Sequence, residues 1–232
     1  MAELAAPGDG EERAAPERHD VRQTGNAHFG AGTEEPRHTD ASRTCQRGDQ
    51  RTRIMGSIVY RDLQVHEAQL LGTIDRSERI DGIYRATNGI LEFIETRQEI
   101  PSWAGAELAG YVARLQALIN SGGRVFAAWD ERRLVGIGSL DASGVGGDCA
   151  VMKLDMLYVS AEYRGRGIGR MLTGMVANLA RSLGATVLYI SATPTRGTVD
   201  AYLRMGASVL GAPDPELLAR EPEDIHLALS LA

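Results

Sequence analysis

The chain has 232 residues and a formal net charge of −6, with 25 Lys and Arg residues against 31 Asp and Glu residues. An acidic chain lacks the positive surface that broad binding to nucleic acid or a membrane surface requires, so we expect neither partner. Two widely separated cysteines, Cys45 and Cys149, predict no disulfide framework and no metal site, and they fit a reducing cytoplasm. No apolar run approaches the ~18 residues of a membrane-spanning helix.

The N-terminal segment differs in composition from the rest of the chain. Within residues 1–53 the large apolar side chains are Met1, Leu4, Val21 and Phe29. Such a segment cannot bury enough apolar surface to offset the entropy lost on ordering. We therefore predict a disordered tail or a non-native extension over residues 1–55, with Met55 as an alternative start of translation. One folded domain is expected over residues 57–232.

Hydrophobic periodicity predicts the elements of the first half of this domain. A strand is expected over 58–63 and a short helix over 66–74. Two short strands then form a hairpin around Asn88-Gly89, a pair that favours a tight turn; their ranges are 83–85 and 90–95. A helical stripe covers 108–119 and ends at Ser121-Gly122-Gly123. A second hairpin is expected from the apolar runs 125–129 and 134–140.

The second half alternates strands with helices. A third apolar run, 151–159, leads through glycines into an amphipathic helix that ends at Gly184, where a helix C-cap belongs. The remaining predicted elements are a strand over 186–191, a short helix over 199–205 and a final strand over 225–231. Residues 213–224 are expected to form a rigid acidic loop. This order predicts the α/β class, with a mixed sheet in a single domain.

Residues 164–169 read Arg-Gly-Arg-Gly-Ile-Gly and lie between an expected strand and an expected helix. A helix N-terminus has unpaired N–H groups and partial positive charge, and glycines let a ligand approach the main chain. The turn therefore predicts a phosphate or pyrophosphate site. No Lys-Ser/Thr follows the last glycine, as a P-loop requires, and the spacing is not Gly-x-Gly-x-x-Gly. A tight turn without a ligand is the alternative.

The same residues resemble a known family. Arg164-x-x-Gly167-x-Gly169, preceded by Leu157-Tyr158-Val159, resembles the acyl-CoA-binding signature of the GNAT superfamily of N-acyltransferases, Gln/Arg-x-x-Gly-x-Gly/Ala. The resemblance covers about residues 57–232 and implies a GNAT-like mixed, mostly antiparallel central sheet flanked by helices. It implies acetyl-CoA as the acyl donor. The residues it assigns to that donor are Leu157, Tyr158, Val159, Arg164, Gly165, Arg166, Gly167, Ile168, Gly169 and Arg170. The sequence departs from the family at Ala161, where proline is common.

Residues 191–207 resemble the family helix that carries a tyrosine near the thioester sulfur, and the resemblance implies that Tyr202 is the general acid. Two positions in that segment differ from the common pattern: Thr195 replaces asparagine and Ala207 replaces phenylalanine. The alternative for Tyr202 is an amphipathic residue packed at a helix end with its hydroxyl in water.

The base that deprotonates the amine is not identified by the sequence. Asp155, Glu131 and Asp141 are candidates, and each is expected to be a solvated surface carboxylate. Many such enzymes use a chain of water molecules instead. His226 in the last strand is expected to be structural, and Trp103 either caps the acceptor cleft or anchors its loop. The charged residues 75–79 either line the acceptor pocket or form a solvated loop.

The resemblance implies an N-acetyltransferase that moves an acetyl group from acetyl-CoA to an amine by direct attack in a ternary complex. The acceptor is a small-molecule or protein amine, no metal is expected, and the expected location is the cytoplasm. One alternative is a non-catalytic regulatory module that binds CoA or acyl-CoA. Another is a module that binds a different phosphate ligand, such as a nucleotide.

Overall fold

The computed structural model describes residues 57–232. The predicted tail over residues 1–55, with the alternative start at Met55, lies outside the described residues, and so does Cys45. No helix within the described residues is long and apolar enough to cross a membrane.

A seven-stranded sheet has the order β1-β4-β5-β6-β7-β9-β8. Its strands are β1 (Val59–Asp62), β4 (Arg124–Asp130), β5 (Arg133–Asp141), β6 (Val151–Val159), β7 (Val187–Ala192), β8 (Ser208–Val209) and β9 (Ile225–Ser230). All neighbouring strands are antiparallel except β6 and β7, which are parallel. The helix that connects β6 to β7 makes this parallel pairing possible. The predicted mixed, mostly antiparallel α/β sheet is confirmed.

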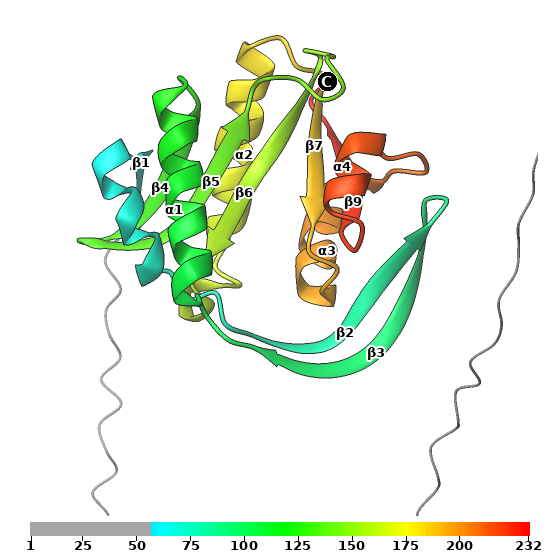
Figure 1. Ribbon diagram of the computed structural model, residues 1–232, viewed down its shortest axis with the longest axis horizontal. Helices are drawn as coiled ribbons and strands as arrows, with labels where there is room; N and C mark the ends of the chain where they lie inside the picture. Colours follow the sequence, from blue (N-terminus) through cyan, green and yellow to red (C-terminus); the bar gives the residue numbers. More distant parts are fainter. Residues whose placement is uncertain (1–56) are drawn as a thin grey trace, which may run out of the picture. The chain divides into compact units, whose positions relative to one another are not determined.

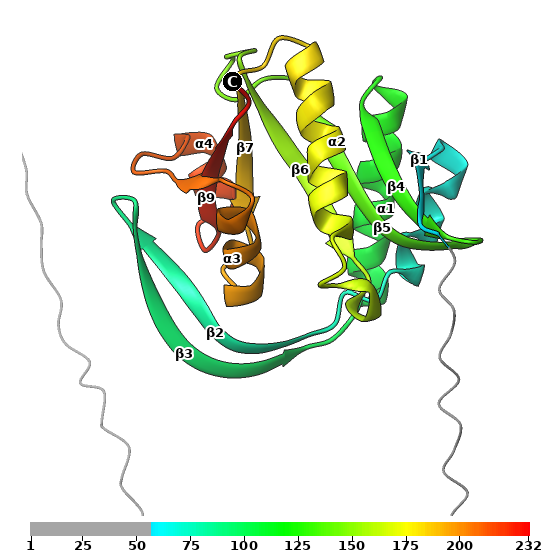
Figure 2. The same cartoon turned by 180° about the vertical axis from the view of Figure 1, so that it is seen from behind.

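Helices cover both faces of the sheet (Figures 1 and 2). The 3₁₀ helix η1 (Val65–Thr73) and α1 (Gly105–Asn120) pack on one face, and α2 (Ile168–Ser182) packs on the other. The short helices α3 (Arg196–Arg204) and α4 (Pro215–Arg220) follow β7 and β8. Each face therefore has its own apolar core, one around Leu115 and Ile137 and the other around Leu172 and Leu188.

Helix α2 lies close to the sheet because β5 has glycine where side chains would face the helix. A Cβ placed on Gly136 would lie 3.2 Å from a Leu172 methyl carbon, and one on Gly138 would lie 3.2 Å from the Leu172 Cβ. Leu172 fills this space and is fully buried. The N-terminus of α2 is thereby held against β5 and β6.

Replacing Leu172 by alanine should therefore lower the free energy of unfolding by about 2–5 kcal/mol, the usual cost of a cavity in a packed core. Denaturant unfolding measures this change. Met171→Ala is the matched control, because the neighbouring Met171 side chain is exposed on the same helix, and its effect should stay within about 0.5 kcal/mol. Equal losses in the two variants would contradict the packing described for α2.

A long β-hairpin forms a separate two-stranded sheet from β2 (Glu78–Thr87) and β3 (Ile90–Ile100). The predicted Asn88-Gly89 turn is confirmed, with φ of 50° and 79°. Figure 1 shows the hairpin curving past α3 towards α4. The Tyr84 N–H donates to the Pro194 carbonyl (2.8 Å) and the Tyr84 hydroxyl donates to Asp200 (2.9 Å), so the hairpin is fastened to α3.

The expected rigid loop over residues 213–224 is wrong, because this segment contains α4. The Asp214 side chain accepts hydrogen bonds from the N–H groups of Glu216 (3.1 Å) and Leu217 (2.9 Å). Pro215 occupies the first turn of the helix, a position where a missing N–H has no cost. An aspartate cap followed by proline is a helix-start signal that the acidic composition of the segment conceals.

Candidate active site

Strands β6 and β7 pair over only part of their length. Their paired residues end at Leu154 and Ile190, whereas β6 continues along β5 until Val159 lies opposite Gly136. The register of β5 and β6 shifts beside Asp155, which forms a bulge. Because a bulge bends its strand, β6 turns away from β7 at this point, as Figure 1 shows. Within residues 57–232, residues 155–159 of β6 consequently pair with no strand on the β7 side.

The glycine-rich turn joins the end of β6 to the start of α2. Gly165 and Gly167 have φ of 74° and 82°, a left-handed conformation that side chains with a Cβ rarely adopt. Gly167 is the N-cap, and no side chain caps the helix. The N–H groups of the first helical turn, at Ile168, Gly169 and Arg170, therefore have no carbonyl partner within α2. A Cβ on either of the two left-handed glycines would meet open space.

The three arginines of the turn lie in different surroundings. The Arg164 guanidinium donates to the carbonyls of Val159 (3.1 Å) and Ser77 (2.9 Å), so it ties the turn to the end of β6 and to residues 75–79. The Arg166 guanidinium lies 5.2 Å from the centre of the Tyr163 ring, and Arg170 reaches the Arg204 carbonyl at 3.5 Å. All three are close enough to the turn to add positive charge to it.

Ala161 occupies the position where proline is common in the family that the sequence resembles, and it forms a main-chain hydrogen bond that proline could not form. Its N–H donates to the Asp75 carbonyl (2.7 Å), and the hydroxyl of the preceding Ser160 accepts from the Asp75 N–H (3.0 Å). Proline has no N–H and would lose the first of these bonds. Asp75 and Ser77 therefore hold the turn through main-chain groups, so this part of residues 75–79 is not a detached solvated loop.

The side chains of β6 beyond the bulge point to both faces of the sheet. Leu157 and Val159 pack into the core beneath α2. Tyr158 lies on the other face, edge-on to Trp103 (ring centroids 5.1 Å apart) and Tyr111 (5.9 Å); burial raises the pKa of its phenol. Trp103 also donates from its indole to the Ile74 carbonyl (2.8 Å). Trp103 thus anchors its loop, which was one of its two predicted roles.

Tyr202 lies on α3, inside the core beneath α2, and only 6% of it is exposed. Burial, together with the nearby Asp224 carboxylate, raises the pKa of its phenol well above the usual value. Thr195, in place of the common asparagine, caps α3: its hydroxyl accepts from the Thr198 N–H (3.4 Å).

Comparison with known proteins decides the family. The family model described as Acetyltransferase (GNAT) family matches residues 90–207, about half of the chain. The chain belongs to the GNAT acetyltransferase family. It is therefore an acyltransferase enzyme, as the resemblance of its glycine turn implied. No curated protein matches the chain by sequence.

Several solved structures share the GNAT fold at low identity. The chain resembles nourseothricin acetyltransferase with a TM-score of 0.58 and 19% identity, over 75% of this chain and 99% of that one. It also resembles a Bacillus anthracis protein assigned as streptothricin acetyltransferase and solved with acetyl coenzyme A, with a TM-score of 0.52 and 15% identity, over 75% of this chain and 97% of that one. A third similar structure is the PaiA N-acetyltransferase of Thermoplasma acidophilum, solved with coenzyme A, with a TM-score of 0.50 and 13% identity, over 75% of this chain and 99% of that one.

The three carboxylates named as candidate bases have different surroundings in this GNAT domain. The expectation that Asp155 is solvated is wrong, because its side chain is 7% exposed and forms an ion pair with Arg114 from α1. Glu131 is exposed in the turn between β4 and β5. Asp141 accepts from the N–H (3.0 Å) and hydroxyl (2.6 Å) of Ser143. Asp141 therefore stabilises a surface turn, and Glu131 is a surface residue of another turn.

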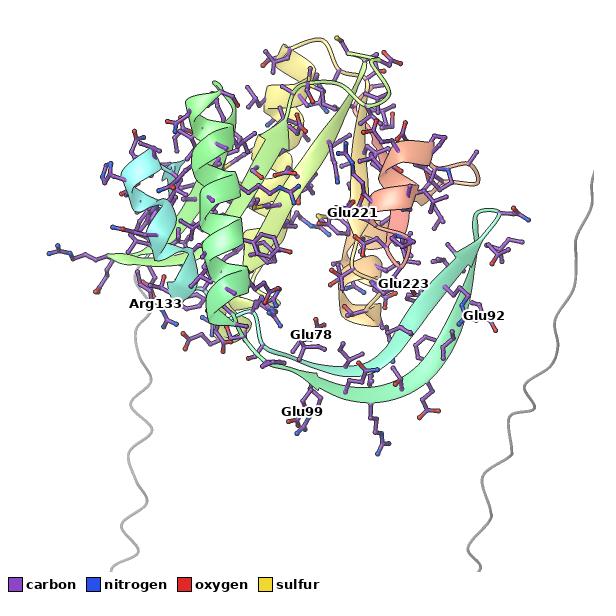
Figure 3. All side chains as sticks on the ribbon, viewed as in Figure 1. Glu78, Glu92, Glu99, Arg133, Glu221 and Glu223 are labelled. Carbon is purple, nitrogen blue, oxygen red and sulfur yellow. The ribbon has the colours of Figure 1, made fainter. Side chains whose placement is uncertain are left out.

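Sequence reasoning missed two carboxylates in the connection from α4 to β9, Glu221 and Asp224. The Lys153 ammonium of β6 donates to Glu221 (2.9 Å). Burial is the largest influence on the Glu221 carboxyl and raises its pKa, but the hydrogen bond and charge of Lys153, together with the charge of Arg114, outweigh burial, so the net pKa is lowered. Burial, followed by the charge of Glu221, raises the pKa of Asp224. Figure 3 shows Glu221 and the adjacent Glu223 beside β7.

His226 at the start of β9 has the structural role that the sequence predicted. Its Nδ1 lies 2.8 Å from the Tyr189 hydroxyl and its Nε2 lies 3.2 Å from the Glu221 carbonyl. Both ring nitrogens are therefore engaged in the fold. Within residues 57–232, no group of three or more metal-ligating His, Cys, Asp or Glu side chains comes together.

Proposed function

We propose that this GNAT enzyme transfers an acetyl group from acetyl-CoA to an amine by direct attack in a ternary complex. The observation that carries the proposal is the continuity of two features. The unpaired edge of β6 over residues 155–159 leads directly to a helix N-terminus that glycines leave open. An extended thioester with a pyrophosphate at its far end fits a strand edge followed by a cluster of N–H groups.

In this proposal the main chain holds the donor. The backbone of Leu157, Tyr158 and Val159 pairs with the pantetheine arm, as an added strand would. The N–H groups of residues 165–170 bind the pyrophosphate, helped by the positive end of α2. Arg166 and Arg170 add charge beside the turn, whereas Arg164 positions the turn through its bonds to the main chain.

The proposed chemistry needs one proton donor from the protein. Acetyl-CoA supplies an acetyl thioester; the amine nitrogen forms a bond to the acetyl carbon while the C–S bond breaks. The Tyr202 hydroxyl gives its proton to the departing sulfur, and the proton lost by the amine passes to water and returns to Tyr202. A phenol carries its proton at neutral pH, and burial raises the pKa of Tyr202 further. Cys149, the one cysteine in the described part of the chain, is exposed before β6 and offers no covalent route.

We further propose a small-molecule amine as the acceptor and the cytoplasm as the location. Two of the similar folds are named after nourseothricin and streptothricin, which are small molecules. A protein amine is the other acceptor class. The cytoplasm is the compartment that the sparse cysteines indicate.

A free-thiol assay over a panel of amines, combined with thermal shifts, tests the function. Acetyl-CoA at about 100 times its dissociation constant should stabilise the fold by about 2.7 kcal/mol, and thiol release should depend on an amine. Stabilisation by acetyl-CoA without thiol release from any amine would favour the regulatory module. Stabilisation by ATP or NAD but not by acetyl-CoA would overturn the proposed donor.

A further inference from the structure

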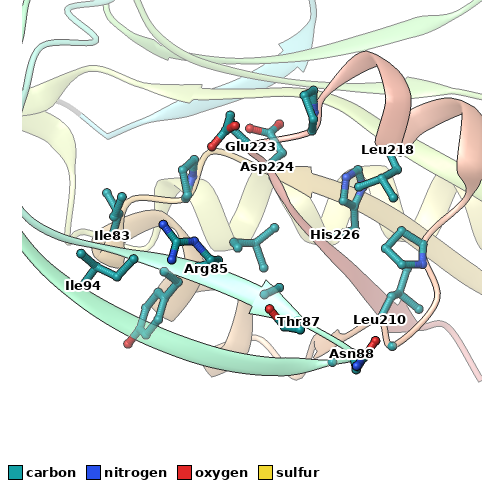
Figure 4. A pocket seen from close by; sticks show the side chains of 18 residues that line it. Ile83, Arg85, Thr87, Asn88, Ile94, Leu210, Leu218, Glu223, Asp224 and His226 are labelled. Carbon is teal, nitrogen blue, oxygen red and sulfur yellow. The ribbon is translucent and has the colours of Figure 1, made fainter. Parts of the chain in front are cut away.

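A cavity of about 410 Å³ lies between the β2–β3 hairpin and the connection from α4 to β9. The hairpin supplies one wall through Ile83–Asn88 and Ile94. The opposite wall comes from residues 210–213, 218 and 222–226 (Figure 4). Pro194, two residues after the end of β7, also lines it. The cavity therefore reaches the end of β7, the strand that pairs with β6.

The charged side chains of the cavity are unevenly placed. Glu223 and Asp224 lie together on the β9 wall, and Arg85 lies on the hairpin wall (Figure 4). Arg85 is mostly exposed and lies 3.9 Å from Glu92 across the hairpin. His226 has both ring nitrogens engaged, as described above. The β9 wall is therefore negative and lacks a cation of its own.

Asp224 is the unusual group on that wall. It is partly buried, and it forms no hydrogen bond or ion pair with any side chain in residues 57–232, whereas neighbouring Glu221 has Lys153. Removing a carboxylate from water without a partner costs free energy. The folded state therefore raises the pKa of Asp224 above its unfolded value, so its ionisation at neutral pH destabilises the fold. A positive ligand group would remove that cost.

We propose that this cavity binds a cationic group of the acceptor, separate from the amine that is acetylated, with Asp224 as its counter-ion. The inference rests on the proposed function and narrows its acceptor to an amine that carries a second positive charge. The hairpin confines this group against the β9 wall.

Calorimetric titration of spermidine into the acetyl-CoA-free protein tests the site without requiring turnover. We expect Asp224→Asn to weaken spermidine binding about tenfold, because one charge-assisted contact is lost, and Asp224→Glu to retain most of the affinity. Glu99→Gln is the matched control: Glu99 is an exposed hairpin carboxylate, 77% exposed, that pairs with Arg79 and does not line the cavity. Its spermidine affinity should equal that of the wild type.

Kinetics with a matched pair of acceptors give the second readout. Replacing Asp224 by asparagine should raise KM for 1,4-diaminobutane about tenfold and leave KM for butylamine, which has one nitrogen, within twofold. Equal spermidine affinity in the wild type and Asp224→Asn, or no spermidine binding to the wild type, would overturn the proposal even if acetyl transfer occurs. Asp224-dependent binding with no thiol release from any amine would instead overturn the proposed function and leave the cation site standing.

Discussion

Tyr202→Phe should lower kcat by about 100-fold or more, the usual contribution of a positioned general acid. The departing thiolate would have to take its proton from water, because phenylalanine removes the hydroxyl and nothing else. The dissociation constant of acetyl-CoA should stay within twofold, since the proposed donor contacts are main-chain groups of β6 and α2. Thiol release under saturating substrates gives kcat, and calorimetry gives the dissociation constant.

The control for Tyr202 is Tyr60→Phe, which removes a partly buried hydroxyl from β1 at the far edge of the sheet. Its kcat should match the wild type. Tyr202 forms no side-chain hydrogen bond within residues 57–232, so Tyr202→Phe should not lower the melting temperature, and a loss of activity is then not a loss of fold. An unchanged kcat in Tyr202→Phe would remove this tyrosine from the mechanism.

Local signals were sufficient for the elements that build the donor side. The strand over 151–159 matched β6, and the amphipathic pattern after the glycines matched α2, including its end before Gly184. Such elements are determined by apolar periodicity and by turn residues, which a single sequence displays. Outside the β2–β3 hairpin, the other predicted boundaries differ from the observed ones by at most three residues, as at β7 and α3.

The length of the β2–β3 hairpin is greater than predicted, because the ends of its strands farthest from the turn carry no alternation of apolar and polar residues. The sequence predicted 83–85 and 90–95, whereas the strands extend to Glu78 and Ile100. Residues 95–99 read Glu-Thr-Arg-Gln-Glu, so they lack the apolar side chains that mark a strand. Their pairing depends on register with the partner strand and on the contact with α3, which are properties of the folded chain.

Long-range contacts explain what the sequence could not reveal about the site. The pairing of Asp155 with Arg114 joins residues 41 positions apart, and that of Lys153 with Glu221 joins residues 68 positions apart. The divergence of β6 from β7 is likewise a matter of register between distant segments. The acidic run 221–224 directly before the last strand was the one visible signal for the acceptor side, but nothing in its spacing distinguishes a paired carboxylate from an unpaired one.

Gly167→Val should weaken acetyl-CoA binding more than tenfold and also destabilise the free protein. At φ of 82° a side chain with a Cβ costs about 1–2 kcal/mol, and a β-branched residue is among the least tolerant of this region. The same Cβ would extend into the open space in front of the α2 N-terminus, where the proposed pyrophosphate lies. The substitution therefore has two effects: it strains the backbone of the turn, and it blocks access to the N–H groups.

Two measurements separate these effects. Denaturant unfolding of the free protein measures the loss of folding free energy caused by backbone strain. Calorimetric titration with coenzyme A measures the loss of affinity caused by the blocked N–H groups. Gly174→Ala is the control, because it lies on the same helix with open space around it and should stabilise the fold by about 0.5–1 kcal/mol without changing coenzyme A affinity. If Gly167→Val loses stability but binds coenzyme A as tightly as the wild type, the glycine turn only shapes the backbone, and the diphosphate must bind elsewhere.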